Sequence, residues 1–122
     1  MAKFREKILA SGAHIILGRD KESNEELVKK FQGKSNKIFH TAARGSPFCV
    51  IDKSVSDEDV YATAVICARY SQDWRNNKKD VKVNVFTGKD VYKSEKMLIG
   101  AFGVKKSKSV VVKKSDILKL LK

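Results

Sequence analysis

The chain has 122 residues, of which 42% are hydrophobic and 33% charged, and only one is a proline. This length and composition exclude a disordered or low-complexity chain and a domain that needs disulfide or metal staples, and they predict one compact domain over residues 1–122. The net charge of +12 at pH 7 favours a polyanionic partner, nucleic acid first and anionic membrane second, with a merely solubilising surface as the alternative.

The cysteines and the amino-terminal sequence indicate which cofactors and which compartment to expect. Cys49 and Cys67 lie in apolar contexts, with no Cys-x-x-Cys motif and no histidine at ligand spacing, so we expect two packed thiols, no metal site and no cofactor. The amino terminus lacks the apolar region of a signal peptide, and no apolar run is long enough to span a bilayer. These patterns predict a cytoplasmic protein.

The first elements in chain order are a predicted hairpin and a helix. Residues 4–9 and 14–17 have strand patterns on either side of a turn at Ser11-Gly12. Ser23 and Glu26 then have the spacing of a capping box, which predicts a helix that begins there and runs through residue 31.

Arg19 stands just before this predicted helix. A helix N-terminus offers free N–H groups and partial positive charge, and a guanidinium adds a bidentate grip on phosphate, so we expect an anion to bind at Arg19. The alternative is a salt bridge from Arg19 to Asp20, Glu22 or another neighbour.

A tight polar corner separates two further predicted strands, at residues 38–41 and 48–51. Gly45 permits a turn conformation that most residues avoid, and Pro47 removes an N–H group before the second strand. Loops on a rigid base commonly carry ligand contacts, so we expect the binding site here. His40 and Ser46 at this corner are, by residue type, more often structural than catalytic, because no Gly-x-Ser-x-Gly context surrounds the serine.

The centre of the chain predicts a buried helix. Ser56 is followed by three acidic residues, which is typical of a helix start. Residues 60–70 are apolar on nearly every side and rich in alanine, so this helix is expected to pack centrally against a sheet and to continue to about residue 77. Trp74 is interpreted as a core or boundary aromatic, with base stacking as the alternative.

The remainder of the chain is rich in predicted strands and in lysine. We expect extended segments at residues 81–86, 91–93, 98–104 and 109–113. A turn at 105–108 joins the last two, and Ser115 caps a closing helix over 116–122. The predicted fold class is α+β, with a mixed but mostly antiparallel sheet packed on the central helix and two shorter helices.

The positive charge is concentrated in this second half. Residues 1–61 hold 11 Lys/Arg against 9 Asp/Glu, or +2, and residues 62–122 hold 15 against 5, or +10. Such a basic face can meet a phosphate backbone without reading sequence, and a solvated lysine surface is the alternative. The lysines expected on this face are Lys78, Lys79, Lys82, Lys89, Lys93, Lys96, Lys105, Lys106 and Lys108.

Several motifs in a fixed order point to one family. They are Gly12-x-x-Ile15-x-x-Gly18-Arg19-Asp20-x-x-x-Asn24, then Phe39-His40 followed by Gly45-Ser46, then Ala68-Arg69-Tyr70-Ser71, Val81-x-Val83 and Val91-Tyr92-Lys93. Over residues 4–113 the chain resembles the NFACT-R domain, the RNA-binding module of the NFACT proteins of ribosome quality control. It departs from the family at Ile38, where a Trp is usual, and at Pro47, where many members have His, so roles of those residues are not carried over.

The resemblance implies a stand-alone, non-enzymatic module that binds structured RNA, either tRNA or large-subunit rRNA, with the large ribosomal subunit as a further partner. The full-length relatives add an N-terminal domain, helix-hairpin-helix segments and a coiled coil, so their tRNA-recruiting and tail-elongating activity is not assigned here. The oligomeric state is left open. The expected RNA-binding residues are Arg19, Asn24, His40, Arg44 and Ser46, surrounded by Lys93, Lys105, Lys106 and Lys108.

Three other functions stay open at this point. A DNA- or membrane-binding adaptor would also use the basic face. An enzyme acting on RNA would use His40 as general acid or base, with Ser46 or Asp20 as its partner, which requires these side chains within hydrogen-bond reach. A protein-binding scaffold would use the charge only for steering.

Overall fold

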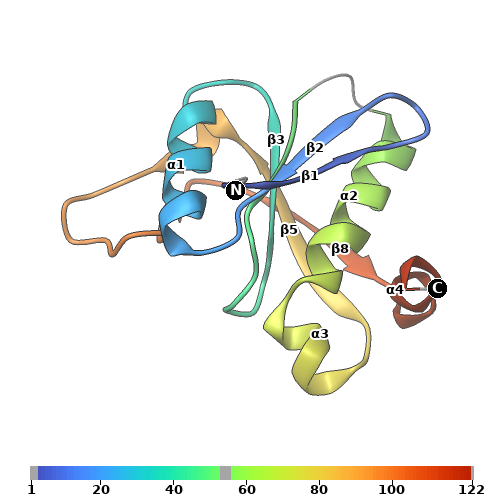
Figure 1. Cartoon of the computed structure of the whole chain (residues 1–122). Coiled ribbons are helices and arrows are strands. Elements are labelled where there is room, and N and C mark those ends of the chain that lie inside the picture. Colours follow the sequence, from blue (N-terminus) through green and yellow to red (C-terminus); the bar gives the residue numbers. More distant parts are fainter. Residues whose placement is uncertain (1–2, 53–55, 122) are drawn as a thin grey trace.

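The computed structural model describes residues 3–52 and 56–121, and it contains one six-stranded sheet and one two-stranded sheet (Figure 1). The large sheet has the order β1-β2-β4-β3-β5-β8, and its neighbouring strands all pair antiparallel. The α+β class is therefore confirmed, while the large sheet is antiparallel throughout and not mixed. The elements are β1 (Arg5–Ile8), β2 (His14–Leu17), α1 (Lys21–Phe31), β3 (Lys37–Thr41), β4 (Cys49–Ile51), α2 (Asp57–Arg69), α3 (Gln72–Asn77), β5 (Val81–Thr87), the 3₁₀ turn η1 (Gly88–Asp90), β6 (Val91–Tyr92), β7 (Gly103–Val104), β8 (Lys108–Val112) and α4 (Lys114–Leu120).

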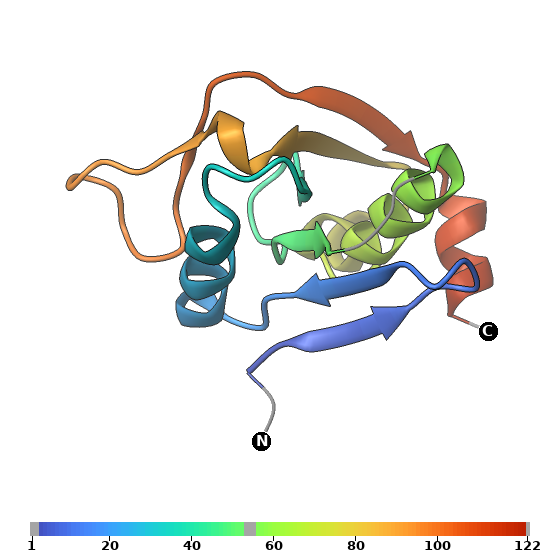
Figure 2. The same ribbon diagram turned by 90° about the horizontal axis from the view of Figure 1, so that it is seen from above.

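Both faces of the large sheet are covered, because apolar residues point to both sides of its central strands. Val81 and Val83 of β5 pack with α2 and α4, whereas Phe86 of the same strand packs with α1. Figures 1 and 2 show α1 and α2 on opposite sides of the sheet. None of the helices in the described ranges is long and apolar enough to cross a lipid bilayer.

Helix α2 is the central alanine-rich helix that the sequence predicts. Ser56 caps it by accepting a hydrogen bond from the Asp59 N–H, and Ala64 and Ala68 are fully buried against the sheet. Cys49 and Cys67 are both buried free thiols, as expected. Burial raises the pKa of Cys49 well above its ordinary value, so this thiol stays protonated.

The predicted continuation of this helix to residue 77 is wrong. Helix α2 ends at Arg69, and a separate short helix, α3, begins at Gln72. The buried Ser71 causes the break, because its hydroxyl donates to the Ala68 carbonyl at 2.6 Å and accepts from the Trp74 N–H at 3.1 Å. Trp74 is only 3% exposed, which confirms a core position.

The predicted start of the first helix is also wrong, by less than one turn. Asp20 is the N-cap of α1, and its carboxylate accepts from the Ser23 N–H at 2.8 Å. Ser23 is the third helical residue, and its hydroxyl accepts from the Asp20 N–H. Asp caps a helix as well as Ser does, so Asp20 takes the position that the capping-box spacing predicts for Ser23.

Two predictions for the C-terminal half need correction. Only Gly103–Val104 of the predicted strand 98–104 is extended, and it pairs with β6, so residues 105–107 connect two different sheets. Residues 94–101 instead form a loop with turns closed by Met97 N–H to Ser94 O and Ala101 N–H to Leu98 O. The closing helix begins at Lys114 after an N-cap at Lys113 that makes no side-chain cap, so Ser115 lies inside the helix.

Candidate nucleic-acid interface

The corner between β3 and β4, residues 42–47, lies between two pockets. The first, of about 490 Å³, is called the arginine pocket and is lined by Arg5, Arg19, Lys21, Tyr70, Gln72 and Arg75 together with backbone around Gly18 and Gly45. The second, of about 610 Å³, is called the apolar pocket and is lined chiefly by His40, Arg44, Phe48, Asn84, Phe86 and Phe102. Gly45, Ile99 and Gly100 line both pockets, so the two are adjacent.

The arginine pocket brings together cations from three elements. Arg5 comes from β1, Arg19 from the segment between β2 and α1, and Arg75 from α3, with Asp20 as the acid among the lining residues. The Arg5 guanidinium lies 4.6 Å from the Tyr70 ring centroid. Such cation–π packing holds a charged side chain in place without neutralising it. A pocket of this kind suits a phosphate group.

Arg5 and Arg75 are functional candidates that sequence reasoning missed. Arg5 lies in a predicted strand and Arg75 near a predicted helix end, and neither belongs to a binding motif. They approach Arg19 only through the order of the sheet and the break between α2 and α3.

The structure changes how Arg19 is understood. The N–H group of Ser23 at the start of α1 is bonded to Asp20, so the chain's own carboxylate occupies this helix end. The Ser23 N–H and hydroxyl, and then the charge of Arg19, lower the pKa of Asp20. Arg19 lines the arginine pocket, and its role in binding an anion stays a prediction.

Asn24 and Ser46, two predicted contact residues, line the arginine pocket but bond to backbone. Asn24 Oδ1 accepts from the Phe48 N–H at 3.1 Å. The absence of a side chain at Gly18 makes room for this amide, since a Cβ there would overlap it. Ser46 is 9% exposed, and its hydroxyl accepts from the Thr41 N–H at 3.0 Å and donates to Pro47 O at 3.1 Å. Both side chains fix the shape of the corner, and direct RNA contact by them stays a prediction.

The tip of the corner is fixed to α3. Gly45 has φ +89°, and its carbonyl accepts from the Gln72 N–H at 2.8 Å. This positive φ favours glycine, and a Cβ at Gly45 would also lie 2.6 Å from the Gln72 side chain, which would have to move. Arg44, next to it, is exposed at the edge of the apolar pocket.

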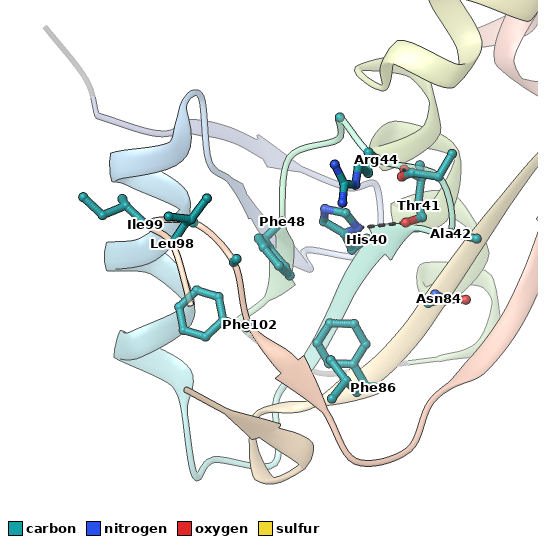
Figure 3. A pocket seen from close by; sticks show the side chains of 15 residues that line it. His40, Thr41, Ala42, Arg44, Phe48, Asn84, Phe86, Leu98, Ile99 and Phe102 are labelled. Carbon is teal, nitrogen blue, oxygen red and sulfur yellow. Dashed lines mark hydrogen bonds between the residues drawn. The ribbon is translucent and has the colours of Figure 1, made fainter. Parts of the chain in front are cut away.

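His40 lies in the apolar pocket as a neutral ring (Figure 3). Its Nδ1 donates to the Thr41 carbonyl at 2.8 Å, and burial lowers the pKa of the imidazole. The ring centroid lies 4.5 Å from that of Phe48. The side chains considered as catalytic partners bond elsewhere, Ser46 to Thr41 and Pro47 and Asp20 to Ser23.

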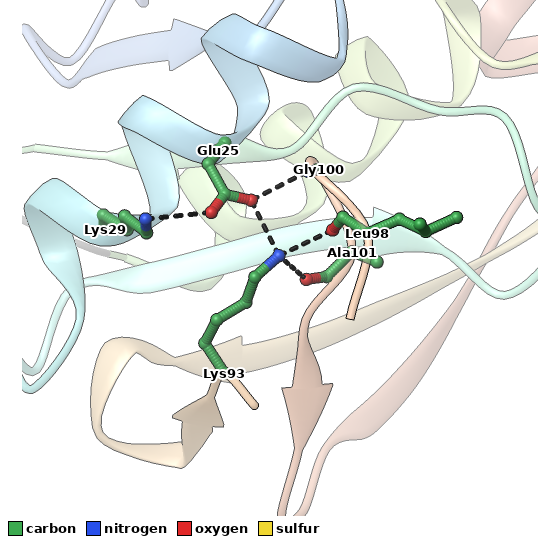
Figure 4. Close-up of polar contacts among 6 residues, drawn as sticks. All are labelled: Glu25, Lys29, Lys93, Leu98, Gly100 and Ala101. Carbon is green, nitrogen blue, oxygen red and sulfur yellow. Dashed lines mark hydrogen bonds and ion pairs between the residues drawn. The ribbon is translucent and has the colours of Figure 1, made fainter. Parts of the chain in front are cut away.

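Lys93 holds the loop of residues 94–101 in place and lies only partly exposed (Figure 4). Its ammonium donates to Glu25 Oε1 at 2.8 Å, to Leu98 O at 2.6 Å and to Ala101 O at 2.7 Å. The same Glu25 oxygen accepts from the Gly100 N–H at 2.8 Å. These bonds lower the pKa of Glu25 to about 2, with the Lys93 hydrogen bond as the main cause. Lys93 therefore has a structural role next to the site, and RNA contact by it stays a prediction.

The remaining predicted lysines do not line either pocket. Lys105, Lys106 and Lys108 are exposed, and Lys106 and Lys108 line a third pocket of about 310 Å³ with Lys37. The charges of Lys106 and Lys105 also lower the pKa of Asp90, after the larger effect of its hydrogen bonds from Thr87. They extend the positive surface without joining the corner.

Among the described residues, no group of three His, Cys, Asp or Glu side chains could hold a metal ion.

Comparison with known proteins agrees with this description. In sequence, the chain is 32% identical over 76 residues to the archaeal Rqc2 homolog aRqcH of Methanocaldococcus jannaschii, covering 60% of this chain and 11% of that protein. In structure, it superimposes with a TM-score of 0.83 on the C-terminal part of the fibronectin/fibrinogen-binding protein of Streptococcus suis, at 22% identity, covering 98% of this chain and 49% of the other. The chain thus spans only a part of the length of either relative.

A sequence model of the NFACT protein RNA binding domain matches residues 3–106, which include both pockets and the corner between them. The RNA-binding role is that of the family as a whole. The chain belongs to the NFACT protein RNA binding domain family.

Proposed function

We propose that this chain is a non-enzymatic module, spanning residues 1–122, that docks on structured RNA, either tRNA or large-subunit rRNA. Its similarity to an archaeal Rqc2 homolog supports a role in ribosome-associated quality control in the cytoplasm, with the large ribosomal subunit as the partner that presents the RNA. The finer choice between these RNAs rests on the family and not on a feature of the pockets.

The arginine pocket is the observation that carries this proposal. Three arginines from segments far apart in sequence line it, and the corner beside it is held by the Gln72 N–H bond to the Gly45 carbonyl and by the Thr41 N–H bond to the Ser46 hydroxyl. A fixed group of arginines grips phosphate bidentately, whereas scattered lysines act as point charges. The pocket therefore supplies a defined contact within a broadly positive surface.

The neutral His40 supports the non-enzymatic part of the proposal. Burial keeps this imidazole neutral and its Nδ1 proton is directed to Thr41, which argues against a general acid at neutral pH. A general base would act through Nε2 and would need a partner side chain within hydrogen-bond reach. Ser46 and Asp20 are occupied by backbone bonds. His40 is accordingly assigned to binding.

A salt titration tests the proposal. Binding to labelled tRNA, a large-subunit rRNA fragment and a matched duplex DNA is measured for the wild type, for Arg19→Glu and for Lys119→Glu, a matched control on α4. We expect one RNA to bind more tightly than the DNA at physiological salt, and to lose that advantage only in Arg19→Glu. Equal binding to all three that fades with salt and ignores both substitutions would leave only a basic surface.

A further inference from the structure

The apolar pocket and the loop beside it carry a more specific inference, which rests on the proposed function. We propose that the apolar pocket binds an unpaired, unstacked nucleobase of the RNA, while the adjoining arginine pocket holds a neighbouring phosphate. The ligand is thus a single-stranded nucleotide in a loop or bulge of structured RNA, and not the duplex part.

The first observation is the exposure of two large apolar side chains at the pocket. Leu98 is 81% exposed and Ile99 is 56% exposed, and both line the apolar pocket. Exposed aliphatic side chains next to each other typically mark a contact surface. Figure 3 shows them from the loop side of the pocket, with Phe102 and Phe48 close by.

The second observation is that this loop is held rigidly. Three hydrogen bonds of the Lys93 ammonium and the Glu25 bond to the Gly100 N–H fix both sides of it (Figure 4). The Lys93 ammonium also lies 4.6 Å from the Phe102 ring centroid. A loop fixed in this way presents its apolar side chains without the entropic cost of ordering them on binding.

The third observation is a cluster of aromatic side chains that line the apolar pocket, called the aromatic floor. The Phe48 ring lies among three others, with centroids at 4.5 Å for His40, 5.8 Å for Phe102 and 6.5 Å for Phe86. Phe48 and Phe86 are buried beneath the pocket, so the partly exposed rings of His40 and Phe102 are the ones a base can contact. Bases released from a stack regain stacking energy on such surfaces, and the contact tolerates different bases because each has a π face. At about 610 Å³ the pocket is also within the usual size range of small-molecule sites.

The fourth observation is the polar composition around this floor. The neutral His40 ring has Nε2 as an acceptor, and the amide of Asn84 supplies N–H donors, which together can meet a base edge. Arg44 is exposed at the same pocket, and the arginine pocket begins across Gly45 and Ile99. An apolar peptide could contact the aromatic rings of the apolar pocket. A nucleotide would contact these rings and the cations of the arginine pocket at once, so the charge favours RNA.

The experiment compares two RNA hairpins that differ only in the loop, one with ordinary bases and one with abasic residues at the same positions. Affinities are measured for the wild type, for Leu98→Ser and for Leu118→Ser, a control at an exposed leucine on α4. Figures 1 and 2 show α4 at the opposite end of the molecule from residues 94–101. Removing the loop bases should weaken wild-type binding by about fivefold or more, the loss of one stacked base.

The two leucine variants test whether the apolar pocket holds the base. Leu98→Ser should lower affinity for the ordinary hairpin and should no longer distinguish it from the abasic hairpin, whereas Leu118→Ser should behave as the wild type. If Leu98→Ser and the wild type lose the same affinity on base removal, the apolar pocket holds no base, even though RNA binding through the arginine pocket stands. That result would point to a peptide as the occupant. Failure of the wild type to bind either hairpin would instead overturn the proposed function, and this inference with it.

Discussion

Lys93 and Glu25 form a half-buried ion pair at 2.8 Å that joins the residue after β6 to helix α1, although 68 residues separate them in sequence. Their side chains are only 18% and 15% exposed. The pair orders the loop that separates the arginine pocket from the apolar pocket, because both partners also bond to the loop backbone. The geometry of both pockets depends on this contact.

Replacement of this carboxylate should loosen the loop without unfolding the domain. In Glu25→Gln the Gly100 N–H loses its charged acceptor, so hydrogen exchange at Gly100 should become faster, while exchange in β3 and β5 stays slow. Glu22→Gln, an exposed position on the same helix, is the control. Unchanged protection at Gly100 in Glu25→Gln would contradict the role given to the pair.

The same pair predicts a dependence of stability on acid. The pKa of Glu25 is about 2 in the folded chain against an ordinary value of 4.5, so ionised Glu25 stabilises the fold fully above pH 4.5 and loses this effect as the pH falls toward 2. The difference in thermal midpoint between the wild type and Glu25→Gln should therefore shrink over that interval. A difference that stays constant as the pH falls from about 5 to about 2.5 would mean that the carboxylate is not the stabilising group.

Arg75 should contribute to RNA binding although nothing in its local sequence marks it. Arg75→Gln removes one of the guanidiniums of the arginine pocket, so the slope of log affinity against log salt should fall by about one. Arg5→Gln should act alike, and Lys119→Gln on α4 should leave the slope unchanged. If all three changes had the same effect, the pocket would have no special place in the positive surface.

Ser46→Ala should affect folding more than binding. The substitution leaves the buried Thr41 N–H without its acceptor, which costs about 1–3 kcal/mol in the free energy of unfolding. Ser107→Ala, at an exposed position, serves as the control and should change stability little. Denaturant titration measures both. A loss of RNA affinity with unchanged stability would show instead that the hydroxyl contacts RNA, as the family resemblance suggests.

His40 should make the fold less stable below neutral pH. Burial lowers its pKa below the ordinary 6.5, so the unfolded chain takes up a proton more readily than the folded chain does. The stabilising effect of the neutral ring is complete above pH 6.5 and is lost as the pH falls below that value. The thermal midpoint of the wild type should thus drop over this range, and that of His40→Gln should drop less. Parallel curves would argue that other groups titrate.

The elements with strong local signals were predictable from sequence. Ser56 and the three acids after it fix the start of α2, the alternating valines identify β5, and the turn at Gly45 identifies the corner. Where two local signals competed, the prediction failed. Asp20 and Ser23 are both good caps, and Ser71 ends a helix within an apolar pattern that would otherwise continue.

The site was predictable only in part. The corner and Arg19 could be found because motif and turn chemistry are local. Arg5 and Arg75 could not, because the strand order that brings them together depends on pairings between distant segments. The role of Lys93 was missed for a related reason. Its partner Glu25 lies in another element, and a lysine in a basic region gives no sign that it is bonded internally.

The arginine pocket is assembled from residues that range from Arg5 to Gly100, and the bond from Gln72 to Gly45 links its two halves. No fragment shorter than residues 5–100 contains all of it. Contacts of such long sequence separation form late in folding, after local helices and hairpins. Affinity for RNA is therefore a property of the completed domain. In a refolding experiment, RNA binding should be regained with the last step of folding and not with the first.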